Sequence, residues 1–142
     1  MRTTALLLIL SVLMISCDTI KKPLDEFSTV KKAIMTPEWV LQDENGTVIS
    51  YNGQDVSMAF KQESTGLQAS GFAGCNRYFS NVDLQPDMIK FNQPAATLMA
   101  CPDMEGETAF LDLLTKVNAY EISGNELKLF QNKILLLRFK SK

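Results

Sequence analysis

Three cysteines, Cys17, Cys75 and Cys101, offer the most distinctive chemistry in this 142-residue chain. A thiol can take a lipid, close a disulfide, bind a metal or act as a nucleophile, and its surroundings decide which. The sequence contains no histidine, which excludes Cys-His and Ser-His nucleophilic pairs and all His-based metal sites. The carboxylates lack the spacing of a glycosidase pair or a calcium loop, and no phosphate-binding glycine motif is present. We therefore expect no enzymatic activity, no metal and no cofactor.

Cys17 follows a short, largely apolar run, Ala5–Ile15, that ends at the small residue Ser16. A membrane-spanning helix needs about 20 apolar residues, so this shorter run predicts a signal peptide over residues 1–16. The boundary Met14-Ile15-Ser16-Cys17 resembles the lipobox of bacterial lipoproteins. The resemblance implies that Cys17 becomes the mature N-terminus and carries a diacylglyceryl thioether and an N-acyl chain such as palmitate. An ordinary secretory signal with a chance cysteine is the alternative.

Lipid on Cys17 would anchor the protein in the bacterial cell envelope, because each buried methylene contributes about 0.8 kcal/mol to membrane binding. We expect the anchor in the outer membrane, with the protein facing the periplasm. Asp18 favours the inner membrane under the sorting rules of one group of bacteria, so the choice of membrane stays open. Residues 17–36 carry many charges and few large apolar side chains, which predicts a tether with a short helix at Phe27–Met35.

Residues 37–142 predict a single antiparallel β domain, because short alternating apolar segments are separated by turn residues such as Asn45-Gly46. The expected strands are Trp39–Leu41, Val56–Phe60, Leu67–Gly71, Met88–Phe91, Glu126–Phe130 and Ile134–Phe139. The loop between Cys75 and Cys101 contains the least regular part of the domain. Ile134–Leu137 is apolar at every position, which favours a place inside the sheet or under a helix over an exposed edge.

The segment Glu105–Val117 predicts a helix, because its apolar residues recur at spacings of three and four. Acidic residues lie in its first turn and Lys116 in its last, as the helix dipole favours. We interpret the apolar face as part of the core, with a ligand-contacting stripe as the alternative. The face consists of Ala109, Phe110, Leu113, Leu114 and Val117.

Two segments stand in a specific order between an opening strand at Trp39 and a closing strand pair. They are Gly74-Cys75-Asn76-Arg77-Tyr78 and Thr97-Leu98-Met99-Ala100-Cys101-Pro102. In this order they resemble the META domain of the HslJ-like type, and the resemblance covers nearly all of residues 37–142. It implies a mainly β fold, a small antiparallel β-barrel of lipocalin-like topology with one packed α-helix. It also implies a link to heat shock and envelope stress, and no shared reaction. The family often has a glycine soon after the first motif, where this chain has Phe79-Ser80-Asn81, so the local turn there stays open.

Once Cys17 is lipidated, Cys75 and Cys101 are the only pair of thiols in an oxidising compartment, which favours a disulfide between them. Closing a loop of this length would stabilise the fold by about 3–4 kcal/mol through the entropy of the unfolded chain. The alternative is two buried, reduced cysteines, because cysteine is also a good small core residue. A redox-active pair is disfavoured, because the chain has no Cys-x-x-Cys motif and neither cysteine has an adjacent base.

Asn76 and Arg77 are the polar residues of the first motif, and they allow two interpretations. As a recognition loop, Arg77 could fork onto a carboxylate or phosphate of a partner. As a structural element, Asn76 would satisfy main-chain groups of the turn and Arg77 would pair with Asp103 or Glu105. Our sequence reading favours the structural role.

The chain has a formal net charge of -2 and no dense basic block, so we expect no nucleic-acid partner. We expect a monomer that meets the membrane through its lipid. Two functional hypotheses remain. The first is a binding or assembly module that holds a lipid, a peptide or another envelope protein. The second is a structural stress-protection lipoprotein with no dedicated ligand.

Overall fold

The computed structural model describes the backbone of residues 21–142 and the side chains from residue 26 onward. The predicted signal peptide and Cys17 lie outside the described residues. The elements in chain order are α1 (Lys21–Met35), β1 (Trp39–Gln42), β2 (Ser50–Tyr51), β3 (Gln54–Asp55), β4 (Ser57–Glu63), β5 (Gly66–Phe72), β6 (Arg77–Leu84), β7 (Ile89–Phe91), β8 (Ala95–Ala96), α2 (Glu105–Lys116), β9 (Ala119–Ser123), β10 (Glu126–Gln131) and β11 (Ile134–Ser141).

One antiparallel sheet with the strand order β7-β6-β5-β4-β1-β11-β10-β9 forms most of the domain. The first strand, β1, lies in its middle and joins the β4–β7 meander to the C-terminal strands through β4 and β11. The sheet curls until its end strands come together, and the Tyr120 hydroxyl on β9 donates to the Gln85 and Pro86 carbonyls, 3.0 and 3.1 Å away. The prediction of a mainly β, barrel-shaped fold with a packed helix is confirmed.

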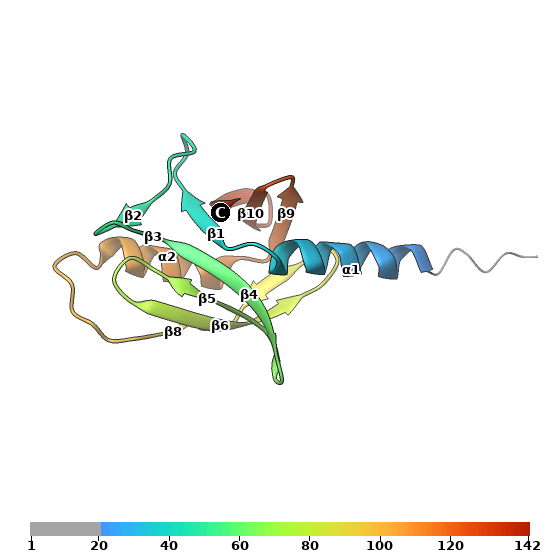
Figure 1. The fold of residues 1–142 in the computed structure, drawn as a ribbon, viewed down its shortest axis with the longest axis horizontal. Helices are drawn as coiled ribbons and strands as arrows, with labels where there is room; N and C mark the ends of the chain where they lie inside the picture. The colour runs from blue at the N-terminus through green and yellow to red at the C-terminus, as the bar shows by residue number, and fades with distance from the viewer. Residues whose placement is uncertain (1–20) are drawn as a thin grey trace, which may run out of the picture.

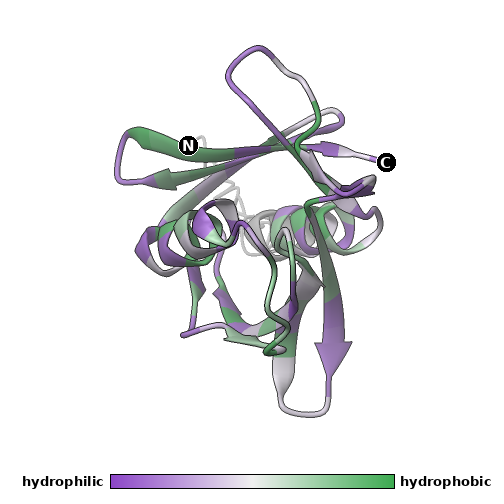
Figure 2. Ribbon diagram, turned by 90° about the vertical axis from the view of Figure 1, so that its left-hand side faces the viewer, coloured by the Kyte–Doolittle hydropathy of each residue, from purple (hydrophilic) through white to green (hydrophobic). Residues whose placement is uncertain are grey.

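Helix α2 packs onto the curved sheet through Phe110 and Leu114, which are buried. The Phe110 ring lies edge-on to Tyr78 at 5.4 Å and to Phe139 at 6.4 Å between ring centroids, which ties the helix to β6 and β11. Figure 2 shows the two helices nearly end-on, with strands above and below them. Burial of each such side chain stabilises the fold by about 1.5–3 kcal/mol, so this face of α2 is an integral part of the core.

Helix α1 is longer than the expected Phe27–Met35 and is part of the folded domain at its C-terminal end. Ile34 is fully buried, and the Trp39 indole N–H donates to its carbonyl oxygen at 2.9 Å. Phe27, Val30 and Ile34 share one partly buried side of the helix because they are three and four residues apart. The C-terminal end of α1 therefore packs with residues 37–142. Neither helix in the described part of the chain is long and apolar enough to cross a membrane.

The region between the two motif cysteines is more regular than expected, because it contains β6, β7 and β8. Tyr78, Ser80 and Val82 of β6 point inward, while Phe79 points outward. The alternation is hidden in the sequence because a polar residue lies inside and an aromatic one outside. Ser80 is accommodated in the interior because its hydroxyl donates to the Asn92 carbonyl at 2.7 Å. The segment Phe79-Ser80-Asn81 is therefore strand and contains no turn.

The expectation for Ile134–Leu137 is only partly correct. Strand β11 does lie inside the sheet, but β1 pairs only with its second half, from Arg138 onward. The first half therefore has a neighbouring strand on one side alone, and Ile134 and Leu135 are 65% and 40% exposed. This end of β11 leaves apolar side chains at the surface.

Candidate functional site

The Gly74–Arg77 motif is held by the carboxylate of Glu107, which α2 places against it. Glu107 is only 6% exposed, and one carboxylate oxygen accepts the backbone N–H groups of Cys75 and Asn76 at 3.0 and 2.6 Å. The other oxygen accepts the Asn76 side-chain amide at 2.8 Å. Buried carboxylates require such donors, so the motif loop and the first turn of α2 stabilise each other.

Asn76 connects this loop to the second motif. Its amide nitrogen also donates to the Met99 carbonyl at 3.2 Å, and its oxygen accepts the Met99 N–H and the Thr97 hydroxyl, both at 2.8 Å. The side chain is 1% exposed, and both amide hydrogens and both oxygen lone pairs are used. Asn76 therefore has no polar atom left for a partner, in agreement with the structural interpretation.

Cys75 and Cys101 form a disulfide in the structure, with their Cα atoms 6.1 Å apart, inside the usual range. The bond joins the same two segments that Asn76 joins, so covalent and polar links act in parallel. Its formation in the cell stays a prediction, with two reduced cysteines as the alternative. Alkylation of the mature protein without reductant, followed by mass spectrometry, tests it.

Arg77 lies at the surface at the start of β6, and its backbone N–H donates to the Thr97 hydroxyl at 3.2 Å. The pairing with Asp103 or Glu105 is not present among the described residues, because Asp103 accepts the Glu105 backbone N–H instead. The carboxylate that meets the motif is Glu107. Arg77 has no ion pair among the described residues, and a recognition role for its side chain stays a prediction.

An apolar recess of about 290 Å³ opens beside α2, between the helix and the end of β1. Residues of the predicted apolar helix face line it, among them Ala109, which is exposed, and Leu113, which is half-buried and packs against the core. The ligand-contacting stripe, which we held as the alternative for this face, stays a prediction. The remaining lining residues are Leu41, Gln42, Asp43, Glu44, Ile49, Tyr51, Val56, Ala73, Gly106, Phe110, Leu136 and Leu137.

Tyr51 forms one wall of the recess and fits there because two glycines make room for it. A side chain at Gly106 would overlap the Tyr51 hydroxyl, and one at Gly74 would press on the Tyr51 ring. Neither the place of Tyr51 beside the recess nor the role of Glu107 was predicted from the sequence. Glu107 was recognisable only as an acidic residue in the first turn of a helix, and no local pattern distinguishes Tyr51.

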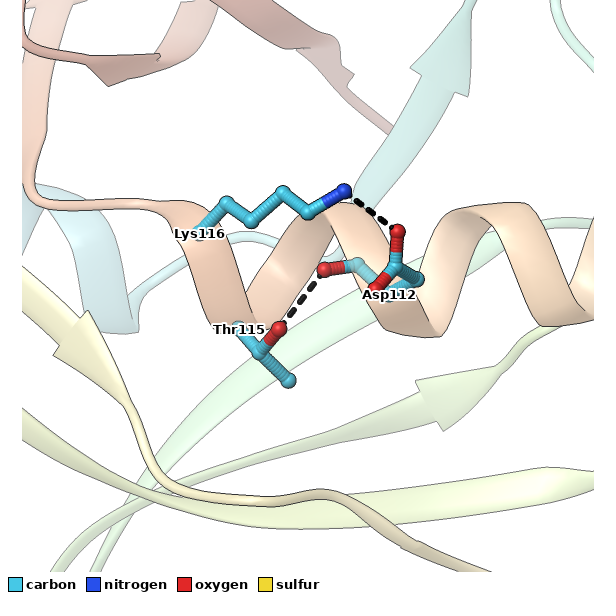
Figure 3. Close-up of polar contacts among 3 residues, drawn as sticks. All are labelled: Asp112, Thr115 and Lys116. Carbon is cyan, nitrogen blue, oxygen red and sulfur yellow. Dashed lines mark hydrogen bonds and ion pairs between the residues drawn. The ribbon is translucent and has the colours of Figure 1, made fainter.

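A second, shallower recess lies along the outer side of the same helix and is lined by Met104, Glu105, Thr108, Ala109 and Asp112. The Asp112 carboxylate accepts the Lys116 ammonium group at 2.6 Å, one turn further on, and the Thr115 hydroxyl donates to the Asp112 carbonyl (Figure 3). Both recesses include Ala109, so they meet on the exposed side of α2. Within the described residues no group of three or more potential ligands could hold a metal ion.

The Tyr78 hydroxyl lies in the core and donates to the Ser57 carbonyl at 3.2 Å. Burial raises the pKa of Tyr78 above its ordinary value, because the phenolate could not be solvated there. Tyr120 at the sheet seam also has a raised pKa, through burial first and the negative charge of Asp87 second. Both groups are neutral at pH 7.

These features define a class: a small antiparallel β-barrel domain whose two motif segments are joined by a disulfide and by the buried side chain of Asn76, while Glu107 of α2 holds the first segment. The META domain family model matches residues 32–142, and the chain belongs to this family. The match begins inside α1 and includes the C-terminal end of this helix.

Two NMR structures share the fold. A protein from Burkholderia xenovorans is 24% identical and has a TM-score of 0.60, over 80% of this chain and 87% of that one. A second protein is 19% identical with a TM-score of 0.58, over 78% of this chain and 92% of that one. At these identities the likeness concerns the fold alone. No curated protein matches the sequence.

Proposed function

We propose that this protein is a lipid-anchored envelope lipoprotein whose META domain is a binding or assembly module linked to heat shock and envelope stress. Its anchor is lipid on Cys17, in the outer membrane and facing the periplasm. The observation that supports the proposal best is the apolar recess beside α2. The partner is an envelope protein, a peptide or a lipid, and the recess is where it binds.

The recess supports a binding role because exposed apolar residues lie close in sequence to its apolar lining. Val48, Ile134 and Leu135 are exposed, and each lies within two residues of a lining residue. Exposed apolar side chains beside a recess are typical of interaction sites in soluble domains. Asn76, in contrast, uses its side-chain polar groups in hydrogen bonds within the domain, so the recess is the better candidate for a partner site.

We also propose that the protein is not an enzyme. The absence of histidine supports this proposal, because the commonest general base is missing. Glu107, the buried carboxylate next to the motif, is already bound by three neutral donors. Such a carboxylate is a structural acceptor and is poorly placed to move protons during a reaction.

Co-purification from membranes in a mild non-ionic detergent tests the binding role. We expect the lipidated protein to bring down a stoichiometric partner, and Ala109→Trp to lose it, because the indole would fill the recess. Thr115→Trp is the matched control, since Thr115 lies on the same helix and lines neither of the two recesses beside Ala109. A partner retained by Ala109→Trp contradicts binding at the recess.

A Cys17→Ala form tests the anchor in the same experiment, and we expect it to leave the membrane fraction. The structural stress-protection hypothesis makes a different prediction. It requires an empty purification together with envelope sensitivity in a deletion strain that the Ala109→Trp variant still relieves. The complementation assay therefore separates the two functional classes.

A further inference from the structure

The two recesses share the lining residue Ala109, and we define them together as one groove, with an apolar floor and acidic sides. Ala109 and Leu113 contribute to the floor from α2, and Leu136 contributes from β11. Ala109 and Thr108 of α2, and Met104 directly before the helix, line the groove toward the start of α2. A floor built from both a helix and a strand stays in place when a ligand arrives, which reduces the entropy cost of binding.

The charges along this groove are all of one sign. Asp43 and Glu44 line one recess and Glu105 and Asp112 the other, while no lysine or arginine lines either of them. Asp112 is the only one of the four acids with an ion pair among the described residues, to Lys116 (Figure 3). The groove therefore presents uncompensated negative charge beside an apolar floor.

Resting on the function proposed above, we propose that this groove binds a cationic amphipathic peptide segment. An apolar side chain of the segment fills the recess, and neighbouring lysine or arginine side chains meet Glu44 and Glu105. Opposite charges at such a rim raise the association rate and select the partner. The segment belongs to another protein or is a free peptide of the same chemistry.

Other occupants fit the groove less well. Anionic lipid headgroups and acidic peptides would bring like charge against the acids, and a second copy of this chain would bring the same acidic rim. The deeper recess, at about 290 Å³, suits one or two side chains, and the second recess is shallow and open, so neither encloses a whole lipid. Charge and size therefore agree on a peptide.

The position of the groove also favours a peptide over the anchoring bilayer. In Figure 1, β2, β3 and the start of α2 lie at one end of the domain, and α1 extends from the other end. In the sequence, α1 is the described element nearest to the predicted lipid on Cys17. The groove borders the start of α2, at the end of the domain opposite α1, where a peptide segment can reach it.

Fluorescence anisotropy of labelled 12-residue peptides, with the lipidated mature protein in a non-ionic detergent, tests this inference. The probes are an alternating Leu/Lys peptide and two versions of it in which Gln or Glu replaces every Lys. We expect the Lys peptide to bind at least tenfold more tightly than either of the others, and to weaken as salt screens the charges. The double variant Glu44→Gln with Glu105→Gln should reduce that affinity at least tenfold, and Ala109→Trp should abolish binding, while Thr115→Trp leaves it unchanged.

Thermal unfolding of each variant shows that the fold is intact, and the two exposed Glu→Gln changes carry the test if Ala109→Trp fails to fold. Equal or tighter binding of the Gln or Glu peptide overturns the inference and leaves the proposed binding function standing. If no peptide binds but Ala109→Trp still loses the co-purified partner, the peptide inference is likewise wrong and the proposed binding function stands. If no peptide binds and Ala109→Trp changes nothing in either assay, both the inference and the binding function are wrong.

Discussion

Replacing Asn76 by alanine should destabilise the domain strongly, because this side chain makes four hydrogen bonds in the interior. A hydrogen bond within a protein contributes about 1 kcal/mol net, and a buried partner left without one costs about 1–3 kcal/mol. Alanine would leave the Met99 N–H and one oxygen of Glu107 without these partners. Partial rehydration of the exposed loop would return some of the loss, so we expect about 3 kcal/mol.

For a domain of this size, 3 kcal/mol corresponds to a fall in Tm of roughly 10–20 °C. Urea unfolding followed by the fluorescence of Trp39 gives the free energy directly, since this buried indole reports on the core. Asn81→Ala is the matched control, because Asn81 is exposed and lies on β6, the strand that directly follows Asn76. We expect the control to change the free energy of unfolding by less than about 0.5 kcal/mol.

Glu107→Gln tests the same network from its other side. Both carboxylate oxygens accept hydrogen bonds, from the N–H groups of Cys75 and Asn76 and from the Asn76 amide. A glutamine amide must place an NH2 group against a donor in either orientation, so we expect a loss of about 2–3 kcal/mol. If Asn76→Ala and Glu107→Gln each cost less than about 1 kcal/mol, the reasoning that this pair holds the motif together is refuted.

Removal of the disulfide by Cys75→Ala with Cys101→Ala should lower the free energy of unfolding by about 3–4 kcal/mol, the loop-closure value for the sequence separation of 26 residues. Urea unfolding of this variant and of the wild type purified without reductant measures the difference, and equal stabilities would contradict the disulfide. Tyr78→Phe should cost about 1 kcal/mol at pH 7 by losing its bond to a main-chain carbonyl. Above the ordinary pKa of 10.0, Tyr78 ionises only in the unfolded state, which stabilises that state. The free energy of unfolding of the wild type should therefore fall by about 1.4 kcal/mol more than that of Tyr78→Phe between pH 9 and pH 11. Parallel pH profiles of the two proteins would contradict this. Gly106→Ala should cost about 1–3 kcal/mol because the methyl group meets the Tyr51 hydroxyl, and in a Tyr51→Ala background the same change should be neutral or stabilising in thermal unfolding.

Alternation and helical periodicity predicted the elements whose inward residues are apolar. The hairpin of β4 and β5 and helix α2 have mainly apolar residues at the buried positions, such as Phe60, Leu67 and Phe110. Strand β6 escaped prediction because Ser80 points inward and Phe79 outward. Local pattern therefore reports burial only where residue type and burial agree, and a buried hydroxyl with a hydrogen-bond partner breaks that agreement.

By itself, the sequence determined the order of the motifs, the boundaries of most strands, the helix and the family, because these depend on neighbouring residues and on specific residue types. The tertiary structure decided which acidic residue meets the motif. Glu107 lies 31 residues from Asn76, and only the packing of α2 onto the sheet brings the two together. The tertiary structure also decided which residues of the apolar helix face line a recess. Ala109 and Leu113 do so, beside the short pairing of β1 with β11. Those distant contacts, which no local pattern encodes, separate the core of this domain from its candidate binding site.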